Sequence, residues 1–309
     1  MKAIRIHRFG GPEVLVIDDL PDPEPAEGEL LVRVLASGVN PVDHKIRDGD
    51  FFGPERLPFA MGRDVAGLVE QVAPGLDAFA PGDPIYAMLP MDRGGHAELV
   101  AVPAGACARW AGCLDPIAAA SVPLAGLTAW QGLFDHGGLQ PGQHVLIHGA
   151  AGGVGHLAVQ FARAKGARVS ATAGANDIDF VRKLGAEQVV DYRAERFEDA
   201  VRDVDLVLDL VAGDTQDRSW SVLKRGGVLV STLAPPSDDK AARHGARGLN
   251  FMAQPSVVQL GEIASLVDAG EVTPHVDRVF PFGAVAEAQR YLAEEHVRGK
   301  VVLQILDEV

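Results

Sequence analysis

The stretch that decides the fold is His144-Val145-Leu146-Ile147-His148-Gly149-Ala150-Ala151-Gly152-Gly153-Val154-Gly155. Its apolar first part is typical of a buried parallel strand, and the small residues after it predict a tight turn. A helical pattern then runs from His156 to Lys165, and a second strand is predicted from Ala167 to Thr172. Ala150-x-Gly152-x-x-Gly155 in this frame is a dinucleotide-binding fingerprint with Ala in place of the first Gly. A βα turn without a ligand is the alternative, and the complete frame favours cofactor binding.

Each small residue of the turn has an expected role. Gly152 allows the backbone to approach a pyrophosphate, and Gly155 allows the helix to pack on the strand. The backbone N–H groups at the start of the helix face the phosphate charge. The cofactor-binding residues predicted in the turn are Ala151, Gly152, Gly153 and Val154.

Composition and charge limit the possible partners. The 309 residues include 28 Lys and Arg against 42 Asp and Glu, a net charge of −14, which argues against a nucleic-acid-binding surface. The first residues alternate like a strand and lack the apolar core of a signal peptide. The longest uncharged stretch, 116–134, contains Pro and Gly and is expected to be buried core, with no membrane partner. The two cysteines have no metal or redox spacing, so we expect a cytoplasmic protein with reduced thiols.

The chain divides into three segments. Residues 1–123 show short alternating stretches broken by Pro and Gly, which predict antiparallel strands such as 30–35, 66–72, 84–88 and 97–102. Residues 124–253 predict an α/β, doubly wound domain with six parallel strands, at 145–147, 168–171, 188–190, 206–210, 227–231 and 249–251. Residues 254–309 predict helix, strand, helix and strand, and are expected to return to the first domain.

Several ordered motifs carry a resemblance that covers essentially the whole chain. They are Gly10-Gly11-Pro12-Glu13-Val14-Leu15, Gly38-Val39-Asn40-Pro41-Val42-Asp43, Gly62-Arg63-Asp64-Val65-Ala66-Gly67, Gly94-Gly95-His96-Ala97-Glu98, Leu127-Thr128-Ala129-Trp130 and Arg298-Gly299-Lys300-Val301-Val302. Together with the glycine turn, they resemble the medium-chain dehydrogenase/reductase superfamily and its zinc-free quinone oxidoreductase, or zeta-crystallin-like, branch. The resemblance implies a GroES-like catalytic domain, a Rossmann domain, a cofactor in the cleft between them and a homodimer.

The resemblance also bears on zinc. Zinc-dependent members hold catalytic zinc through Cys, His and a second Cys or a carboxylate. In this chain the first position is Asn40, the second is Arg63, and the third falls near Val122-Pro123. The four-cysteine structural zinc lobe is missing as well. His44 beside Asp43 does not by itself make a metal site, so an enzyme without zinc or flavin is expected.

The expected absence of zinc favours particular substrates. Without a Lewis acid, the alkoxide of a simple alcohol is hard to stabilise. Hydride addition to a conjugated acceptor spreads the charge, and a few hydrogen-bond donors then suffice. Quinones and α,β-unsaturated carbonyls are therefore the predicted small-molecule partners.

The end of the second parallel strand predicts the choice of nicotinamide. NAD enzymes of this fold carry an acid there, whereas this chain has Ala173, Gly174 and Asn176, with no acid before Asp177. Tyr192 lies where related reductases contact a 2′-phosphate. The basic residue that they often place just after this strand is missing, and Arg193 either compensates or is a solvated surface residue. NADPH is the predicted cofactor, with NADH as the alternative.

The remaining candidate residues flank the expected cofactor. Asn40 is predicted to donate to the substrate oxygen and, with Pro41, to lie beside the nicotinamide; closing an Asx turn is its alternative. Asp43 is predicted to orient Asn40, or else to be structural. Thr128 is predicted to bind the nicotinamide ribose or ring, unless it bonds its own helix backbone. Lys300 is predicted to reach the cofactor, unless it is a surface residue. Strand ends complete the cofactor set, at Leu210, Val211, Leu233, Phe251, Met252 and Ala253.

The proton donor has no dedicated candidate. Some relatives carry a Tyr after the Asn-Pro-x-Asp segment, where this chain has Phe51 and Phe52. Water is therefore expected to protonate the product. His96 stands where relatives often have Tyr, and a structural role is its alternative.

Other functions remain as alternatives. An enoyl thioester reductase of the same superfamily would need a basic pocket for the carrier phosphate, and only Arg243 and Arg247 suggest one. A non-catalytic, zeta-crystallin-like role as a structural protein or RNA binder is opposed by the cofactor turn and the net charge. A zinc alcohol dehydrogenase is the least favoured of the four candidate functions. The edge strand near Leu249–Phe251 is a candidate dimer contact.

Overall fold

A computed structural model describes residues 1–306, and these form two compact units. The first unit comprises Met1–Leu124, Gln254–Asp268 and the residues from Pro274 onward. The second comprises Ala125–Ala253 and Ala269–Thr273, so one short piece of the expected return segment belongs to this second unit. Gln160 explains this difference, because its side chain accepts from the Thr273 amide at 2.8 Å and donates to the Thr273 carbonyl at 3.1 Å. The end of the predicted segment, 307–309, lies outside the described residues.

The second unit is built on a six-stranded parallel sheet in the order β11-β10-β9-β12-β13-β14. The order reverses between β9 and β12, which is the point where doubly wound sheets open a crevice at the carboxyl ends of their strands. All six predicted strands are confirmed, with shifted ends: β9 (His144–Ile147), β10 (Arg168–Ala173), β11 (Gln188–Asp191), β12 (Val204–Asp209), β13 (Leu223–Ser231) and β14 (Arg247–Asn250).

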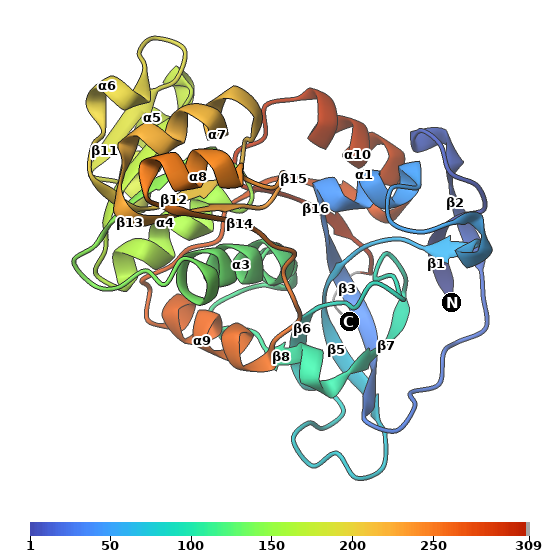
Figure 1. The fold of residues 1–309 in the computed structure, drawn as a ribbon. Helices are drawn as coiled ribbons and strands as arrows, with labels where there is room; N and C mark the ends of the chain where they lie inside the picture. Colours follow the sequence, from blue (N-terminus) through green and yellow to red (C-terminus); the bar gives the residue numbers. More distant parts are fainter. Residues whose placement is uncertain (307–309) are drawn as a thin grey trace. The chain divides into compact units, whose positions relative to one another are not determined.

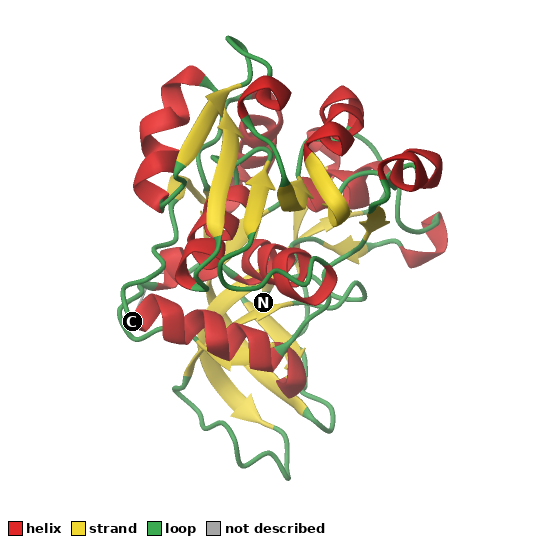
Figure 2. Ribbon diagram, turned by 60° about the vertical axis from the view of Figure 1, so that its left-hand side comes forward, coloured by secondary structure: helices red, strands yellow, loops and turns green. Residues whose placement is uncertain are grey.

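Helices flank this sheet on both faces (Figures 1 and 2). They are α4 (Gly155–Ala164), α5 (Ile178–Leu184), α6 (Phe197–Ala200), α7 (Gly213–Ser219) and α8 (Asp238–His244). In α4, Leu157, Ala158, Phe161 and Ala162 recur at helical spacing and are fully buried. Part of the core joins Leu146, Val207 and Leu229 of the central strands to Phe197 and Trp220. The predicted Rossmann fold is confirmed.

The first unit contains a seven-stranded sheet and a three-stranded sheet. The larger runs β15-β16-β3-β5-β6-β8, with β7 also pairing with β3, and only the β15–β16 pair is parallel. The smaller has the order β2-β1-β4. The strands are β1 (Lys2–Ile6), β2 (Leu15–Asp19), β3 (Glu29–Val39), β4 (Phe59–Ala60), β5 (Asp64–Val72), β6 (Pro84–Met88), β7 (Leu99–Pro103), β8 (Cys107–Arg109), β15 (Val276–Pro281) and β16 (Lys300–Gln304). This mostly antiparallel domain is the GroES-like one that the sequence predicts.

The helices of the first unit position the polar residues of interest. They are α1 (Pro41–Asp48), α2 (Pro116–Ala120), α9 (Val257–Asp268) and α10 (Val285–Glu294), and α3 (Pro123–Trp130) begins here and continues into the second unit. Asn40 is the N-cap of α1, with Pro41 in the first turn, and Gly49 ends the helix at φ +94°. Strand β16 pairs with β3 so that Val301 lies opposite Val39, which brings Lys300 next to Asn40.

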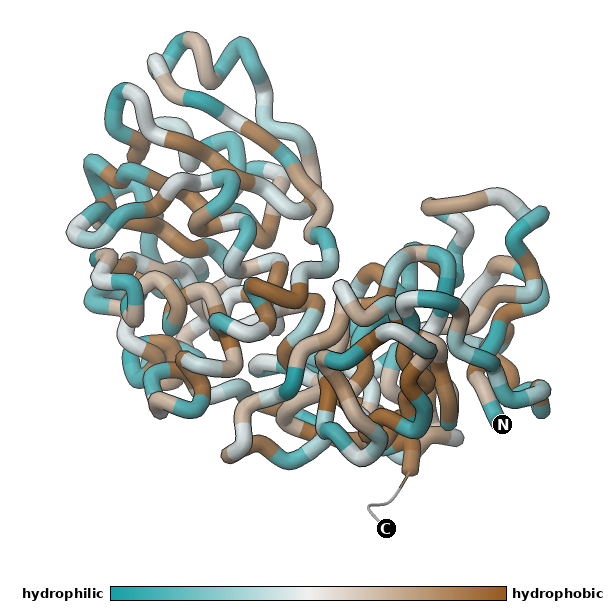
Figure 3. The backbone as a smooth tube through the Cα atoms, turned by 90° about the horizontal axis from the view of Figure 1, so that it is seen from below, coloured by the Kyte–Doolittle hydropathy of each residue, from teal (hydrophilic) through white to brown (hydrophobic). Residues whose placement is uncertain are grey.

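The apolar segments of each unit form its interior. In Figure 3, brown stretches run through each unit and teal stretches are frequent at the turns. The uncharged stretch 116–134 forms α2, α3 and the first part of a π-helical turn, Gln131–His136, and most of it is buried. Within residues 1–306, no helix combines the length and apolar character that a membrane crossing needs.

Candidate active site

The glycine turn of the second unit has the shape that the fingerprint predicts. A Cβ at Gly155 would lie 2.7 Å from the Ala150 Cα and closer still to the Gly149 carbonyl oxygen, so the helix packs there only without a side chain. A Cβ at Gly152 would meet only the Gly149 oxygen, at 3.4 Å. Gly152 therefore borders open space, which a pyrophosphate needs for close backbone approach. The first turn of α4 contains no acidic residue, so its N-terminus remains favourable for an anion.

A row of exposed apolar side chains follows the carboxyl ends of four parallel strands. Tyr192, Val211, Leu233 and Met252 follow β11, β12, β13 and β14 and are 46–53% exposed. Large apolar side chains this exposed are informative when they gather at the edge where doubly wound sheets bind ligands. Leu210 and Phe251 are half-buried there, while Ala253 and Ala151 are buried. The residues of the turn and of this edge therefore fit a dinucleotide.

The end of β10 shows what surrounds the predicted 2′-phosphate position. Ala173 and Gly174 are buried and Asn176 is exposed, whereas Asp177 is fully buried. A Cβ at Gly174 would lie 3.8 Å from the Tyr192 hydroxyl, so the phenol covers this strand end. The Arg193 guanidinium carbon lies 5.5 Å from the centre of the Tyr192 ring.

Asp209 fixes the loop after β12. Its Oδ1 accepts the amides of Val211 at 3.0 Å and Ala212 at 2.8 Å, and its Oδ2 accepts from Gln216 and Ser231, each at 2.9 Å. Ala212 has φ 65° and ψ −164°, a region that side chains other than Gly rarely occupy. The carboxylate therefore stabilises a strained backbone immediately beside the exposed Val211.

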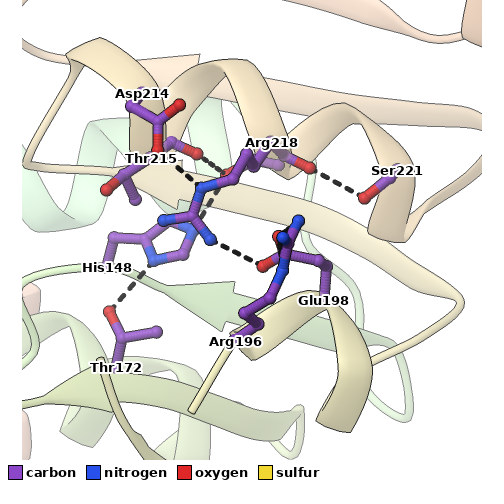
Figure 4. Close-up of polar contacts among 9 residues, drawn as sticks. His148, Thr172, Arg196, Glu198, Asp214, Thr215, Arg218 and Ser221 are labelled. Atoms are coloured by element: carbon purple, nitrogen blue, oxygen red, sulfur yellow. Dashed lines mark hydrogen bonds and ion pairs between the residues drawn. The ribbon is translucent and has the colours of Figure 1, made fainter. Parts of the chain in front are cut away.

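His148, the residue before the glycine turn, makes polar contacts with neighbouring elements of the second unit (Figure 4). Its Nδ1 lies 3.0 Å from the Thr172 hydroxyl and its Nε2 lies 2.9 Å from the Ser219 hydroxyl. Because Ser219 donates to the Thr215 carbonyl at 2.6 Å, it accepts from Nε2–H, and Nδ1 accepts from Thr172. Burial lowers the pKa of His148 to about 4. A neutral imidazole therefore links the turn, β10 and α7.

In the first unit, Asn40, Asp64 and Lys300 form a buried polar cluster. The Asn40 amide Nδ2 donates to Asp64 Oδ2 at 2.7 Å and contacts the Gly38 carbonyl at 3.5 Å. The Lys300 ammonium donates to Asn40 Oδ1 and lies 3.4 Å from Asp64 Oδ2. Asp64 Oδ1 accepts the Leu124 amide at 2.6 Å. Lys300 is only 3% exposed and binds within this cluster, so the alternative of a surface lysine is wrong, and its contact with the cofactor stays a prediction.

Asp43 stands beside the cluster at the start of α1. Its Oδ2 accepts the Asn40 backbone amide at 2.8 Å, so it orients Asn40 by closing the helix cap. Its Oδ1 has no hydrogen-bond partner within the described chain. Burial raises the pKa of this carboxyl to about 7. Asp43 therefore holds a proton for part of the time near neutral pH.

Arg63 and His96 complete the surroundings of the cluster. The Arg63 Nε donates to the Leu89 carbonyl at 2.8 Å, and burial lowers the pKa of the guanidinium. His96 is fully buried, with Nε2 3.4 Å from the Gly38 carbonyl, and burial lowers the pKa of its ring to about 4. His96 is therefore neutral near pH 7 and packs as part of the core.

Thr128, by contrast, lies in α3 within the second unit and is 8% exposed.

Comparison with known proteins decides the family. Residues 26–112 match the family model described as alcohol dehydrogenase GroES-like domain, and residues 184–303 match the one described as zinc-binding dehydrogenase. Quinone oxidoreductase of Lama guanicoe is 32% identical, over 98% of this chain and 97% of its own. The NADPH-dependent alkenal/one oxidoreductase, chloroplastic, of Arabidopsis thaliana is 34% identical, over 98% of this chain and 79% of its own.

Solved structures agree with these relatives. The quinone oxidoreductase from Coxiella burnetii has a TM-score of 0.91 and 34% identity, covering 99% of both chains. The Escherichia coli quinone oxidoreductase complexed with NADPH has a TM-score of 0.89 and 28% identity, over 99% of this chain and 100% of that one. The chain belongs to the quinone oxidoreductase branch of the medium-chain dehydrogenase/reductase superfamily. This medium-chain reductase is an oxidoreductase that uses a nicotinamide cofactor.

The residues of this medium-chain reductase do not fit zinc, although one matching family model is named for it. Within residues 1–306, no three His, Cys, Asp or Glu side chains are grouped as a metal ion requires. Two positions that hold zinc ligands in zinc-dependent members of the superfamily are occupied here by Asn40 and Arg63. Asn40 is hydrogen-bonded to Lys300 and Asp64, and Arg63 carries a guanidinium. A divalent cation there would meet two cationic side chains, Lys300 and Arg63, which repel it.

Three side chains that shape the site are not among the sequence-predicted site residues. Asp64 falls in a quoted motif, but nothing in the sequence shows that it binds Asn40 and Lys300, which lie 24 and 236 positions away. His148 and Asp209 each end or follow a strand, as loop-positioning residues do in parallel sheets. A search for polar residues at strand ends would have found both in this medium-chain reductase.

Proposed function

We propose that this enzyme transfers a hydride from NADPH to quinones or α,β-unsaturated carbonyls without zinc. The observation that carries the proposal is the buried Lys300–Asn40–Asp64 cluster, which fills with hydrogen-bonded organic groups the positions where zinc-dependent relatives need metal ligands. The relatives named for quinone and alkenal/one reduction support the same substrate class.

The preference for NADPH is proposed from the surroundings of Gly174. No carboxylate follows β10 directly, and the exposed Asn176 leaves room for a 2′-phosphate. The Tyr192 hydroxyl and the Arg193 guanidinium are donors of the kind that a phosphate accepts. The Escherichia coli structure with NADPH and the NADPH-dependent Arabidopsis enzyme are consistent with this preference.

When bound, the nicotinamide supplies a hydride to the acceptor. The residues of the cluster then stabilise the negative charge that develops on the acceptor oxygen. Lys300 polarises the Asn40 amide through its Oδ1, which makes the Nδ2–H groups stronger donors. The Nδ2–H facing Gly38 makes only a 3.5 Å contact, so it is the less engaged of the two and is the donor assigned to a substrate oxygen. Asp43 keeps Asn40 in place through the helix cap.

Water is proposed to supply the final proton, and a homodimer is proposed through β14. That strand lies at the edge of the six-stranded sheet, where a second copy can extend it.

The test is the oxidation of NADPH and NADH at 340 nm with 1,4-benzoquinone, 9,10-phenanthrenequinone, an alkenal and a cyclic enone. We expect turnover with NADPH that persists in EDTA. Asn40→Ala should lower kcat/KM by roughly ten- to a thousand-fold while the Kd of NADPH stays nearly unchanged. Activity lost in EDTA and restored by zinc would refute the zinc-independent function, and unaltered turnover in Asn40→Ala would refute the role of Asn40.

A further inference from the structure

Three buried side chains of the second unit, Thr172, His148 and Ser219, form what we call the His148 network. The Thr172 hydroxyl, on β10, donates to His148 Nδ1 at 3.0 Å. The opposite ring nitrogen, Nε2, donates to the Ser219 hydroxyl of α7 at 2.9 Å. Because the Ser219 proton is already given to the Thr215 carbonyl, only this tautomer of the neutral ring satisfies both nitrogens.

Burial makes each bond of the His148 network costly to lose. His148 and Ser219 are fully buried and Thr172 is 4% exposed. A buried polar atom that loses its partner costs more free energy than the bond itself contributes. Removal of one hydroxyl therefore leaves a ring nitrogen unsatisfied, and the imidazole turns away from its present position.

Packing fixes the imidazole as well. The rings of His148 and Phe197 meet at 67° with their centroids 4.7 Å apart. The Arg218 guanidinium carbon lies 4.7 Å from the centre of the Phe197 ring, and its Nη1 donates to Glu198 at 2.7 Å (Figure 4). The ring of His148 is therefore held by an aromatic neighbour that is itself held by an ion pair.

The β10 side of the network reaches the glycine turn through the backbone. Gly149 follows His148 directly and has φ +68°, so the chain changes direction at this point. The Thr172 carbonyl accepts the amide of Ala150 at 3.2 Å. Thr172 therefore holds the turn twice, by its hydroxyl through the imidazole and by its carbonyl through Ala150.

The α7 side reaches the same turn by a second route. Helix α7 begins directly after Ala212, whose backbone is strained, and ends at Ser219. A Cβ at Gly149 would lie 3.4 Å from the Val211 side chain, so the residues before α7 border the turn. Ser219 joins the other end of the helix to His148. The turn is therefore linked to both ends of α7.

The amides of a glycine turn have no side chains with which to adapt to a ligand, so their direction decides how well they bind a pyrophosphate. Groups of this kind have to be held within roughly 0.5 Å of the productive geometry by neighbours that are themselves locked. We propose that the His148 network positions the glycine turn for the pyrophosphate of the nicotinamide cofactor. Thr172, His148 and Ser219 are then positioning residues for cofactor binding, which act through the backbone.

The test is the Kd of NADPH and of NADH, measured by fluorescence titration for variants of Thr172. Thr172→Val keeps the shape of the side chain without its hydroxyl, and should raise the Kd of the tighter-binding dinucleotide at least about fivefold. Thr172→Ser keeps the hydroxyl and should bind like the unmodified protein. Ser219→Ala should weaken binding in the same way as Thr172→Val.

The same two strands offer a matched control. The Ser170 hydroxyl lies 2.8 Å from His144 Nε2 and likewise joins β10 to β9. His144 is the first residue of β9, whereas His148 follows its last residue and enters the turn. Ser170→Ala therefore removes the same kind of bond at the other end of the strand, and should leave the Kd unchanged.

Thermal unfolding of each variant without cofactor separates positioning from stability. A Kd that rises in Thr172→Val, and not in Thr172→Ser or Ser170→Ala, supports the proposal whatever the Tm values are. A lower Tm with an unchanged Kd in Thr172→Val would overturn it, as would an equal rise in Kd in Thr172→Ser or Ser170→Ala. The binding experiment needs no acceptor, so its outcome is independent of whether quinones or enones are reduced.

Discussion

Replacing Lys300 by Met should destabilise the protein far more than an exposed lysine does. Lys300 is 3% exposed and donates to Asn40 Oδ1 and to the Val39 carbonyl, while Asp64 is fully buried. Removing the ammonium leaves the Asp64 carboxylate without its cation and the Asn40 oxygen without its donor. Breaking one side of a buried pair costs about 3–5 kcal/mol of unfolding free energy. Lys224, whose pair with Asp205 is exposed, is the control and should cost about 0–1 kcal/mol when changed to Met.

Urea titration of Lys300→Met, Asp64→Asn and the double variant measures this cost. Because the double variant removes both charges, its destabilisation should fall short of the sum of the singles by about 2 kcal/mol or more. Since Lys300 also polarises Asn40, kcat should fall in Lys300→Met while the Kd of NADPH changes little. Additive single effects, or a Lys300→Met cost equal to that of Lys224→Met, would refute the coupling.

Four further predictions concern the second unit. Gly155→Ala should lower the free energy of unfolding by about 1–3 kcal/mol, because the added Cβ meets backbone atoms. Gly152→Ala, where the Cβ has space, should keep the Tm and weaken NADPH binding. Equal losses of Tm in the two variants would contradict this expectation. Ala212→Gly should raise stability by about 1 kcal/mol in urea titration, because φ 65° then carries no strain, and a lower stability would count against the loop argument. The pKa of His148 is about 4 in the folded protein and near 6.5 in the unfolded chain. The unfolded chain therefore binds the extra proton first, and the free energy of unfolding falls as the pH drops from about 6.5 to 4. His148→Gln should reduce that fall by about 3 kcal/mol, and parallel pH profiles of the two proteins would refute the argument. Arg193→Glu should raise the KM for NADPH several-fold but not that for NADH, and an unchanged ratio would remove Arg193 from the 2′-phosphate site.

The sequence predicts the parallel sheet well because each of its strands is a short apolar run ending at a turn. All six strands occur in the structure. In the glycine turn, Gly152 borders open space and Gly155 packs tightly against the backbone, as the spacing of the fingerprint implies. The last segment also contains the predicted order of helix, strand, helix and strand, at α9, β15, α10 and β16. These elements can be predicted because the spacing of apolar residues within a short segment indicates a strand or a helix.

The polar cluster could be predicted only in part. Asn40 and Asp43 are three positions apart, and the helix cap that joins them is a local signal. The partners Asp64 and Lys300 come from β5 and β16, and only the pairing of β16 with β3 brings Lys300 to Asn40. The sequence alone therefore suggests Lys300 as a cofactor contact and does not reveal that the sheet register makes it a buried partner of Asn40.

Direct hydride transfer is tested most directly by a single turnover with NADPH deuterated at C4, one epimer at a time, and a cyclic enone. Mass spectrometry of the saturated ketone should find one deuterium at the β-carbon from one epimer only, with the same yield in EDTA. A reduced product without deuterium from either epimer, or a yield that depends on added zinc, would contradict metal-free hydride transfer by this enzyme.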